Sequence, residues 1–209
     1  RVIFATAGDK IFGVQKYADA LNKIITDRNI EVMLSCNLES LDGTTKRAVF
    51  SNIKTNEIQE IHYDFIHVTP PMSSPDFIKT SPLSNETGWM DVDKATLRHP
   101  HYSNIYGLGD ASSLPTSKTG AAIRKQAPVV VDHILKTMQG LESSKLYDGY
   151  TSCPLVTGYG RLILAEFDYH GQPAESFPFD QSKERLSMYL LKKYLLPKIY
   201  WNRMLKGKF

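Results

Sequence analysis

The stretch from Asn104 to Gln126, NIYGLGDASSLPTSKTGAAIRKQ, constrains the fold of this chain more than any other part. A short apolar run over 105–108 predicts a buried strand. Asp110 follows directly, so a carboxylate is expected at the carboxyl end of that strand. After a turn that contains Ser and Pro, an apolar-periodic segment predicts a helix, with Ser117 or Thr119 as its cap. The stretch therefore predicts a strand–turn–helix unit with polar groups at the strand end.

The residue types at this strand end suit a nucleotide-like or flavin-like ligand. Gly107 and Gly109 tolerate a positive φ, so we expect the chain to pass close to a flat ligand there. Asp110 can accept hydrogen bonds from sugar-like hydroxyls. Lys118 and the amides of the helix start favour negative charge, such as that on the ring edge of a reduced flavin. An ordinary strand–helix unit with a turn Asp and a cap explains the same pattern.

The chain has 209 residues, of which 42% are hydrophobic, so it can form one large domain or parts of two. No window of 18 apolar residues occurs, and no spanning helix is predicted. The chain starts at Arg1 without an initiator Met, a signal peptide or a presequence, and residues 2–6 predict a strand that is already under way. We therefore expect a partial chain.

The positive charge is concentrated at the carboxyl end. Residues 182–209 hold eight Lys or Arg and one acidic residue, Glu184, which gives +7. The whole chain has 25 basic and 22 acidic residues, so the other 181 residues carry 17 minus 21, or −4. This distribution argues against nucleic-acid binding by the body of the protein and indicates an anionic surface as the target of the tail.

Two cysteines, Cys36 and Cys153, exclude a disulfide framework of the small secreted kind. Cys36 falls on the apolar face of an alternating segment, which predicts a buried, inert thiol. Cys153 lies among Thr, Ser and Pro, where a thiol can be accessible and can hold an extra sulfur as a persulfide. A semi-buried structural cysteine explains this position too. His99 and His101 have no Cys or acidic group at ligand spacing, so solvated loop histidines and no metal site are predicted.

The first third of the chain reads as strand, helix and strand. Residues 2–6 predict a strand, 16–28 an amphipathic helix and 30–38 an alternating strand, which together form a β-α-β unit. Strands over 47–53 and 61–68, with turns near Asp42 and Asn56, predict a meander. A Pro- and Ser-rich connection then runs on to Trp89.

The middle of the chain predicts one long helix. An apolar stripe runs from Ile123 to Met138 at helical spacing. Pro128 lies inside it and is expected to kink or restart the helix. Gly140 is expected to end it.

The tail predicts two amphipathic helices. Asp180 or Ser182 can cap a first helix through Leu196, Pro197 interrupts it, and a second helix is expected over 198–205. Interfacial Tyr and Trp surrounded by basic residues, without the length to span a bilayer, are typical of a segment that lies on a membrane. A helix pair packed on the body, with solvated lysines, is the alternative.

Three stretches carry a resemblance to a known family: GLGDASSLPTSKTGAA at 107–122, YDGYTSCPLVTGYGRLILAEFDY at 147–169 and FPFDQSKERLSMYLLKKYLLPKIYWNRML at 177–205. Together they resemble the eukaryotic, mitochondrial-type sulfide:quinone oxidoreductases, which belong to the flavoproteins with two dinucleotide-binding domains. The likeness covers nearly the whole chain, from IFGVQKYADAL at 11–21 onward.

The resemblance implies an α/β fold: part of a two-dinucleotide-binding-domain (FAD/NAD(P)-like Rossmann) flavoprotein, with a β-meander and carboxyl-terminal amphipathic helices. Residues 1–68 would end the second dinucleotide-binding-like domain and include the meander. Residues 69–146 would return to the FAD-binding domain. Residues 147–209 would hold the redox cysteine and the membrane-facing helices.

The resemblance also implies the cofactor and the residues that contact it. The family binds FAD, and Asp110, Lys118, Thr119, Gly120 and Ala121 match its contact positions. No GxGxxG fingerprint follows a strand in this sequence, so the chain is expected to lack the pyrophosphate cradle and to retain FAD weakly or not at all by itself. Many relatives carry Cys where this chain has Ala111, a difference expected to have little consequence.

In the resembled family two redox cysteines flank the flavin, and sulfide leaves a persulfide on the later one. Cys153 matches that later position by its TSCP context, whereas Cys36 does not match the earlier one. The implied partners are hydrogen sulfide, ubiquinone and a sulfur acceptor such as glutathione. The implied location is the mitochondrial inner membrane, with peripheral attachment through residues 182–209 and no nucleic acid bound.

Two other interpretations remain open at this stage. A type II NADH:quinone dehydrogenase shares the fold, the flavin and the membrane tail, but it needs no redox cysteine, so the context of Cys153 argues against it. The chain can also be a non-catalytic partial product that only binds a membrane surface or a partner.

Overall fold

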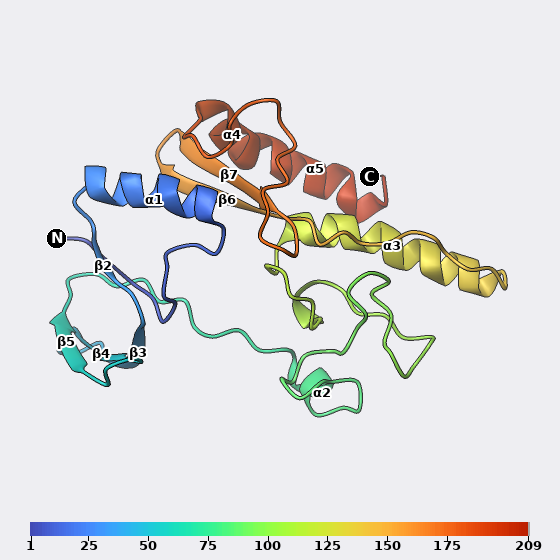
Figure 1. Ribbon diagram of the computed structural model, residues 1–209, viewed down its shortest axis with the longest axis horizontal. Helices are drawn as coiled ribbons and strands as arrows, with labels where there is room; N and C mark the ends of the chain where they lie inside the picture. Colours follow the sequence, from blue (N-terminus) through green and yellow to red (C-terminus); the bar gives the residue numbers. More distant parts are fainter. Residues whose placement is uncertain (209) are drawn as a thin grey trace. The chain divides into compact units, whose positions relative to one another are not determined.

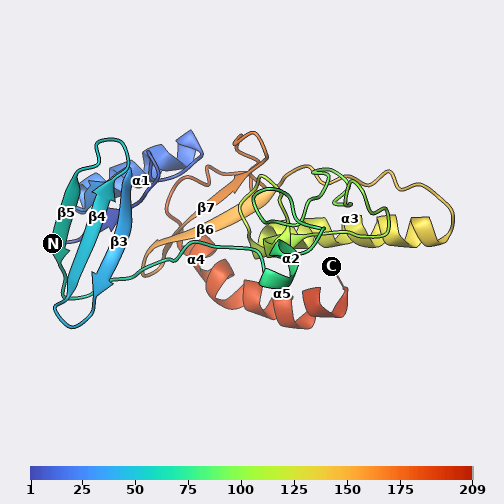
Figure 2. The ribbon, with the colours of Figure 1, turned by 90° about the horizontal axis from the view of Figure 1, so that it is seen from below.

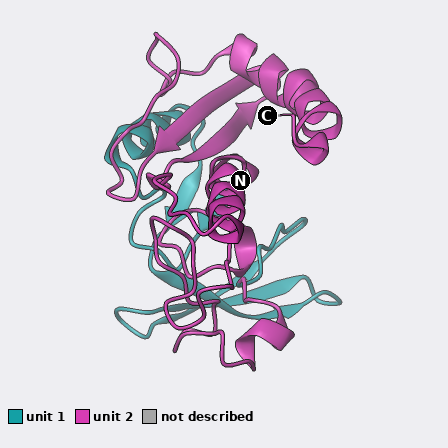
Figure 3. Cartoon of the chain, turned by 90° about the vertical axis from the view of Figure 1, so that its right-hand side faces the viewer, with its two compact units in different colours: residues 1–71 teal, residues 72–209 magenta. Residues whose placement is uncertain are grey.

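The computed structural model describes residues 1–208, and Phe209, the last residue of the predicted tail, lies outside the described residues. The chain divides into two units, Arg1–Pro71 and Met72–Phe209 (Figure 3). The division into three functional segments stays a prediction.

The first unit begins with the predicted β-α-β motif, which is confirmed. Strands β1 (Ile3–Ala5) and β2 (Glu31–Met33) pair in parallel, and α1 (Gln15–Asp27) connects them. The predicted long strand over 30–38 is wrong. Ser35 has a φ of 54° and donates its backbone N–H to the carbonyl of Gly8, so the chain turns there. The residues after this turn leave the parallel pair and start a second sheet.

That second sheet is the predicted meander: β3 (Cys36–Asp42), β4 (Arg47–Asn52) and β5 (Ile58–His62) pair antiparallel in this order (Figure 2). The third strand was predicted over 61–68, but β5 starts three residues earlier, at Ile58, and ends at His62. The side chain of Asn52 accepts hydrogen bonds from the backbone N–H groups of Lys54 and Thr55 at 2.9 and 3.1 Å, which turns the chain at once. Ile58 therefore pairs opposite Ser51.

The second unit opens with an irregular connection that contains only the short helix α2 (Asp76–Lys79) among its described helices. The strand predicted over 105–108 does not form. Within residues 1–208 this segment has only the isolated bridge between Arg98 and Tyr106, and an extended segment becomes a strand only with neighbours along its length. The main core of this unit consists of Ile78, Met90, Val92, Leu97, Leu114, Val129, Val130 and Tyr147.

A turn of 3₁₀ helix, η1 (Gly109–Ala111), precedes the long helix α3 (Gly120–Met138) (Figure 1). The predicted cap is confirmed, because the Thr119 hydroxyl accepts a hydrogen bond from the backbone N–H of Ala122 at 3.1 Å. The predicted restart at Pro128 is wrong, because the helix runs through this residue, which is exposed. Gly140 has a φ of 71° and ends the helix as predicted.

Two antiparallel strands follow, β6 (Thr151–Gly158) and β7 (Arg161–Phe167), in which Cys153 lies opposite Ala165. Residues 162–166 of β7 are buried. Leu162, Leu164 and Met188 form a second core cluster, against which Phe177 and Phe179 pack. This cluster fixes the start of the tail to the hairpin.

The tail differs from its prediction at both ends. Asp180 does not cap a helix, because its carboxylate accepts hydrogen bonds from the N–H and hydroxyl of Ser182 and closes a turn. The helical segment starts at Leu186 and comprises α4 (Leu186–Leu190), a π-helical turn η2 (Leu191–Leu195), α5 (Leu196–Asn202) and a 3₁₀ turn η3 (Met204–Lys206). Pro197 lies in the first turn of α5. Backbone N–H groups in a first helical turn have no partner within the helix, so the missing N–H of Pro197 breaks no hydrogen bond of α5. Among residues 1–208 no helix is both long and apolar enough to cross a membrane.

Candidate functional site

Asp110 lies in η1 with its side chain exposed. The residue before it, Gly109, adopts a φ of 65° and donates its backbone N–H to the side-chain oxygen of Gln126 at 2.8 Å. Gln126 belongs to α3 and is 1% exposed. The carboxylate of Asp110 is thus presented to solvent by a backbone turn that is held from inside the protein.

Lys118 lies close to Asp110. Its ammonium donates to the carbonyl oxygen of Ser112 at 2.5 Å and lies 4.0 Å from the ring centre of Trp89. Burial lowers the pKa of Lys118, and the attraction of Asp110 opposes this effect. The structure therefore brings together Asp110 and Lys118, the two charged residues that the sequence predicts for this site.

Thr119, Gly120 and Ala121 form the start of α3. The first amides of a helix have no partner within the helix and carry partial positive charge. A Cβ added to Gly120 would have nothing within 4 Å, so a side chain at this position would meet open space. Such a helix start, beside a carboxylate and a lysine, can hold a ligand that has both hydroxyl groups and an electron-rich ring edge.

Cys153 lies on β6 and is half-buried. The pKa of the Cys153 thiol is raised above its ordinary value, because burial outweighs the hydrogen bond with Ser117 and the charge of Lys192, which both lower it. Lys192 belongs to the π-helical turn of the tail and donates to the carbonyl oxygen of Pro154 at 2.8 Å. Two groups that favour a sulfur anion therefore lie beside this thiol, one from the segment that precedes α3 and one from the tail.

Threonine side chains join the two halves of the site. The hydroxyl groups of Thr119 and Thr151 lie 3.0 Å apart, and Thr151 also donates to the carbonyl of Ser117 at 3.2 Å. The short segment 117–119 therefore touches the strand of Cys153 on one side and contains Lys118, which lies close to Asp110. All six residues predicted for the site fall in this one region of the second unit.

The prediction for Gly107 needs a correction. A Cβ at Gly107 would lie 2.4 Å from the sulfur of Met90 and 3.0 Å from Val92. The space beside this glycine is filled by the protein core, so Gly107 allows close packing of side chains there and not the approach of a flat ligand.

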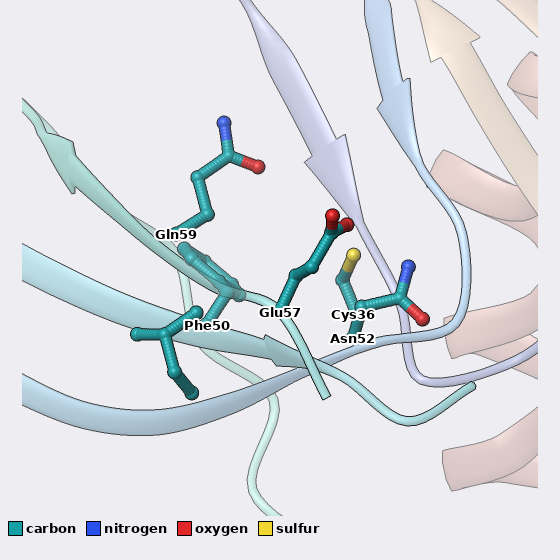
Figure 4. Close-up of a pocket in the computed structure, with 6 residues that line it drawn as sticks. Cys36, Phe50, Asn52, Glu57 and Gln59 are labelled. Carbon is teal, nitrogen blue, oxygen red and sulfur yellow. The ribbon is translucent and has the colours of Figure 1, made fainter. Parts of the chain in front are cut away.

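Cys36 is half-buried and not fully buried as predicted. The turn at Ser35 moves it from the expected parallel strand to the first position of the meander, opposite Asn52. It lines a cavity of about 390 Å³ together with Phe50, Asn52, Glu57, Ile58 and Gln59 (Figure 4). None of these lining residues is basic.

The two neighbouring histidines have different environments. His99 is 3% exposed, and its Nδ1 accepts hydrogen bonds from the backbone N–H groups of His101 and Tyr102 at 3.1 and 3.3 Å. The prediction of a solvated loop histidine is therefore wrong for His99, because its ring closes the turn. His101 is exposed. Within the described part of the chain, no three His, Cys, Asp or Glu residues are grouped so that they could hold a metal ion.

Gln126, Thr151 and Lys192 were not predicted for the site. The sequence could have indicated Gln126, because it is a polar residue beside the apolar stripe of a predicted helix. Thr151 and Lys192 gave none, since their roles depend on contacts between segments that are 32 and 38 residues apart in sequence.

No family model matches the chain. Two solved structures share its fold. One is a chain of the Tetrahymena thermophila mitochondrial ATP synthase tetramer, with a TM-score of 0.81 and 27% identity over 94% of this chain and 48% of that chain. The other is the sulfide:quinone oxidoreductase from Aquifex aeolicus, with a TM-score of 0.79 and 16% identity over 96% of this chain and 49% of that chain. The predicted class, the α/β fold of flavoproteins with dinucleotide-binding domains, is thus confirmed.

Sequence relatives narrow this class. The chain is 52% identical over 207 residues to the mitochondrial sulfide:quinone oxidoreductase of Mus musculus. It is 46% identical over 210 positions to that of Dictyostelium discoideum and 40% over 208 to that of Schizosaccharomyces pombe. These alignments cover 96–100% of this chain and 45–46% of the relatives. The chain is therefore a homologue of the mitochondrial sulfide:quinone oxidoreductases and spans about half their length.

Proposed function

We propose that this chain forms about half of an FAD-dependent sulfide:quinone oxidoreductase, in which Cys153 carries sulfur as a persulfide. The observation that carries the proposal is the contact of segment 117–119 with both sides of the site. Thr119 and Ser117 bond to Thr151 on the strand of Cys153, and Lys118 lies beside Asp110. These contacts link the strand of Cys153 to the segment beside Asp110, which supports a site that uses both.

The residues at the start of α3 fit a flavin cofactor. The exposed carboxylate of Asp110 suits ribityl hydroxyls, and Lys118 with the amides of Gly120 and Ala121 suits the electron-rich edge of the ring system. When bound, FAD would accept an electron pair from the redox cysteines and pass it to a quinone. The contribution of this chain is to bind and orient the cofactor beside Cys153.

The sulfur chemistry assigned to Cys153 balances with a second cysteine outside this chain. Sulfide attacks the Cys153 sulfur of a disulfide, the S–S bond breaks, and the second cysteine leaves as a thiolate. Cys153 then carries a persulfide, whose outer sulfur passes to an acceptor thiol such as glutathione. Ser117 and Lys192 favour the anionic forms of this sulfur against the effect of burial.

We infer that residues 182–209 attach the protein to the surface of the mitochondrial inner membrane, where ubiquinone is available. The described part of this tail exposes a set of apolar and aromatic side chains: Leu186, Leu190, Tyr194, Leu195, Leu196, Tyr200, Trp201 and Leu205. The same segment holds eight Lys or Arg and one acidic residue, which gives it a net charge of +7. Apolar and aromatic side chains among lysines suit the boundary between anionic headgroups and acyl chains.

Replacement of Cys153 tests the sulfur chemistry. In a protein that joins this chain to the remaining half of the enzyme, Cys153→Ser is expected to abolish sulfide-dependent quinone reduction while the flavin absorbance stays unchanged. Cys36→Ser is the matched control and should retain activity, because Cys36 lies in the other unit. Sulfide oxidation that survives in Cys153→Ser would contradict the proposal. A type II NADH:quinone dehydrogenase would instead reduce quinone with NADH, and Cys153→Ser would leave that rate unchanged.

A further inference from the structure

The turn between β6 and β7 presents a single aromatic side chain to solvent. Tyr159 lies between Gly158 and Gly160 and is 99% exposed. Gly160 adopts a φ of 70°, which favours glycine and allows this tight turn. The Tyr159 side chain is therefore available to a surface outside the described chain.

Two further exposed apolar residues lie near this tip. Val156 belongs to the end of β6, and Leu186, the first residue of α4, is 58% exposed. A Cβ added to Gly160 would come within 3.4 Å of the Leu186 side chain, so the hairpin tip touches the first turn of the tail (Figure 2). We call Val156, Tyr159 and Leu186 the tip patch, and Leu186 also belongs to the exposed apolar set of the tail.

The charges around the tip patch favour an anionic partner. Glu184 forms an ion pair with Arg161 at 3.4 Å, and Asp180 lies 3.8 Å from Lys183, so both nearby acids are neutralised. Lys193 and Lys198 follow along the tail and form no ion pair with a described acidic residue. An apolar patch with an interfacial aromatic and excess positive charge complements the surface of an anionic bilayer.

We propose that the tip patch is a second point of membrane contact, in addition to the tail helices, and that it contacts an anionic lipid surface through Tyr159. This inference rests on the proposed membrane attachment of the tail. It adds a consequence for the site, because Tyr159 and Cys153 belong to one hairpin. Six residues of strand at about 3.3 Å each place the thiol about 20 Å from the tip along the chain. Lys192, bonded to Pro154, and Met188, buried against β7, hold the tail to the same hairpin. Membrane contact at the tip would therefore set the distance of Cys153 from the bilayer.

Vesicle binding by the full chain tests the inference. Vesicles of phosphatidylcholine with a minority of phosphatidylglycerol should bind the chain, and Tyr159→Ser should lower the partition coefficient about tenfold, near the lower end of the effect of burying one large apolar side chain. Phe77→Ser is the matched control: Phe77 is 76% exposed, aromatic and in the same unit, and its replacement should leave binding unchanged. Far-UV circular dichroism verifies that each variant is folded.

The variant Trp201→Ser separates the two claims. If it weakens binding while Tyr159→Ser binds like the original chain, the tip contact is overturned and the tail attachment stands. If the original chain binds neither neutral nor anionic vesicles, both are overturned. A second measurement uses Tyr159→Trp in a Trp201→Phe background: brominated lipids should quench the new indole beyond the signal of Trp89, and no added quenching overturns the contact.

Discussion

The hydroxyl groups of Thr119 and Thr151 lie 3.0 Å apart and join the start of α3 to the first residue of β6. Thr151 donates its own proton to the carbonyl of Ser117, and Thr119 accepts from the backbone N–H of Ala122. The Thr119 hydroxyl is therefore the donor between the two threonines. Two side chains thus connect the cap of α3 to the strand that carries Cys153.

Thr151 is fully buried, so removal of its hydroxyl should be costly. Thr151→Val keeps the shape but leaves the Thr119 hydroxyl and the Ser117 carbonyl without their partner. We expect the free energy of unfolding to fall by about 1–3 kcal/mol, measured by urea denaturation. Thr151→Ser retains the hydroxyl and should lose less than half as much. Equal stability of the Val variant and the original chain would show that these hydrogen bonds are not needed.

Gly149 is expected to tolerate no side chain. It has a φ of 86°, and an added Cβ would lie 2.3 Å from the ring of Tyr169 and 2.8 Å from its backbone nitrogen. Gly149→Ala should therefore destabilise the chain by about 3 kcal/mol or more in urea denaturation, since both the backbone and the packing are strained. Gly120→Ala is the control with open space around the new methyl group, and it should change stability by less than about 1 kcal/mol.

Glu166 is a buried carboxylate that accepts hydrogen bonds from three residues. Burial raises the pKa of Glu166, but hydrogen bonds from Tyr150, Gln181 and Ser176 outweigh this and hold it below its ordinary value. A carboxyl group whose pKa is lower in the folded state stabilises the fold above the pKa of the unfolded state, about 4.3 for Glu. That contribution is lost as the pH falls through the folded-state value.

The free energy of unfolding should therefore be lower at about pH 3 than at pH 7, and Glu166→Gln should reduce the dependence over this range. At pH 7 the Gln variant should be less stable by about 1–3 kcal/mol, because it replaces an acceptor by a donor opposite Tyr150 or Gln181. The exposed Glu142→Gln serves as control. An identical pH dependence in Glu166→Gln and the original chain would be the contrary result.

Lys192 should make Cys153 more reactive. Its charge lowers the pKa of the Cys153 thiol against burial, so Lys192→Met should raise that pKa and leave less thiolate near neutral pH. In a Cys36→Ser background, we expect alkylation of Cys153 by iodoacetamide to slow about two- to fivefold, the range for a partly exposed charge contact. Lys193→Met is the control, since the Lys193 ammonium lies over the rings of Tyr189 and Tyr194. An unchanged alkylation rate in Lys192→Met would show that Lys192 does not affect the reactivity of Cys153.

Much of the local structure could be predicted because it depends on neighbours in sequence. The cap at Thr119 and the stop at Gly140 follow from hydrogen bonds and steric limits within a few residues. Some predictions failed because of local turns that Asn52 and Asp180 form with the residues just after them, and others failed where contacts between distant segments decide the structure. Among the described residues, the run at 105–108 has only the isolated bridge from Tyr106 to Arg98, and Met188 of α4 packs with Leu162 and Leu164 of β7.

By itself, the sequence determined the residue types of the site and their order: a carboxylate, a lysine and a helix start, then a thiol some forty residues later. Only the tertiary structure decided that these groups meet, through Thr119 and Thr151, and that Lys192 reaches the strand of Cys153 from the tail. The physical reason is the range of the interactions. Propensity and capping act over one or two turns of chain, whereas the side chains that position this site come from elements that packing alone brings together.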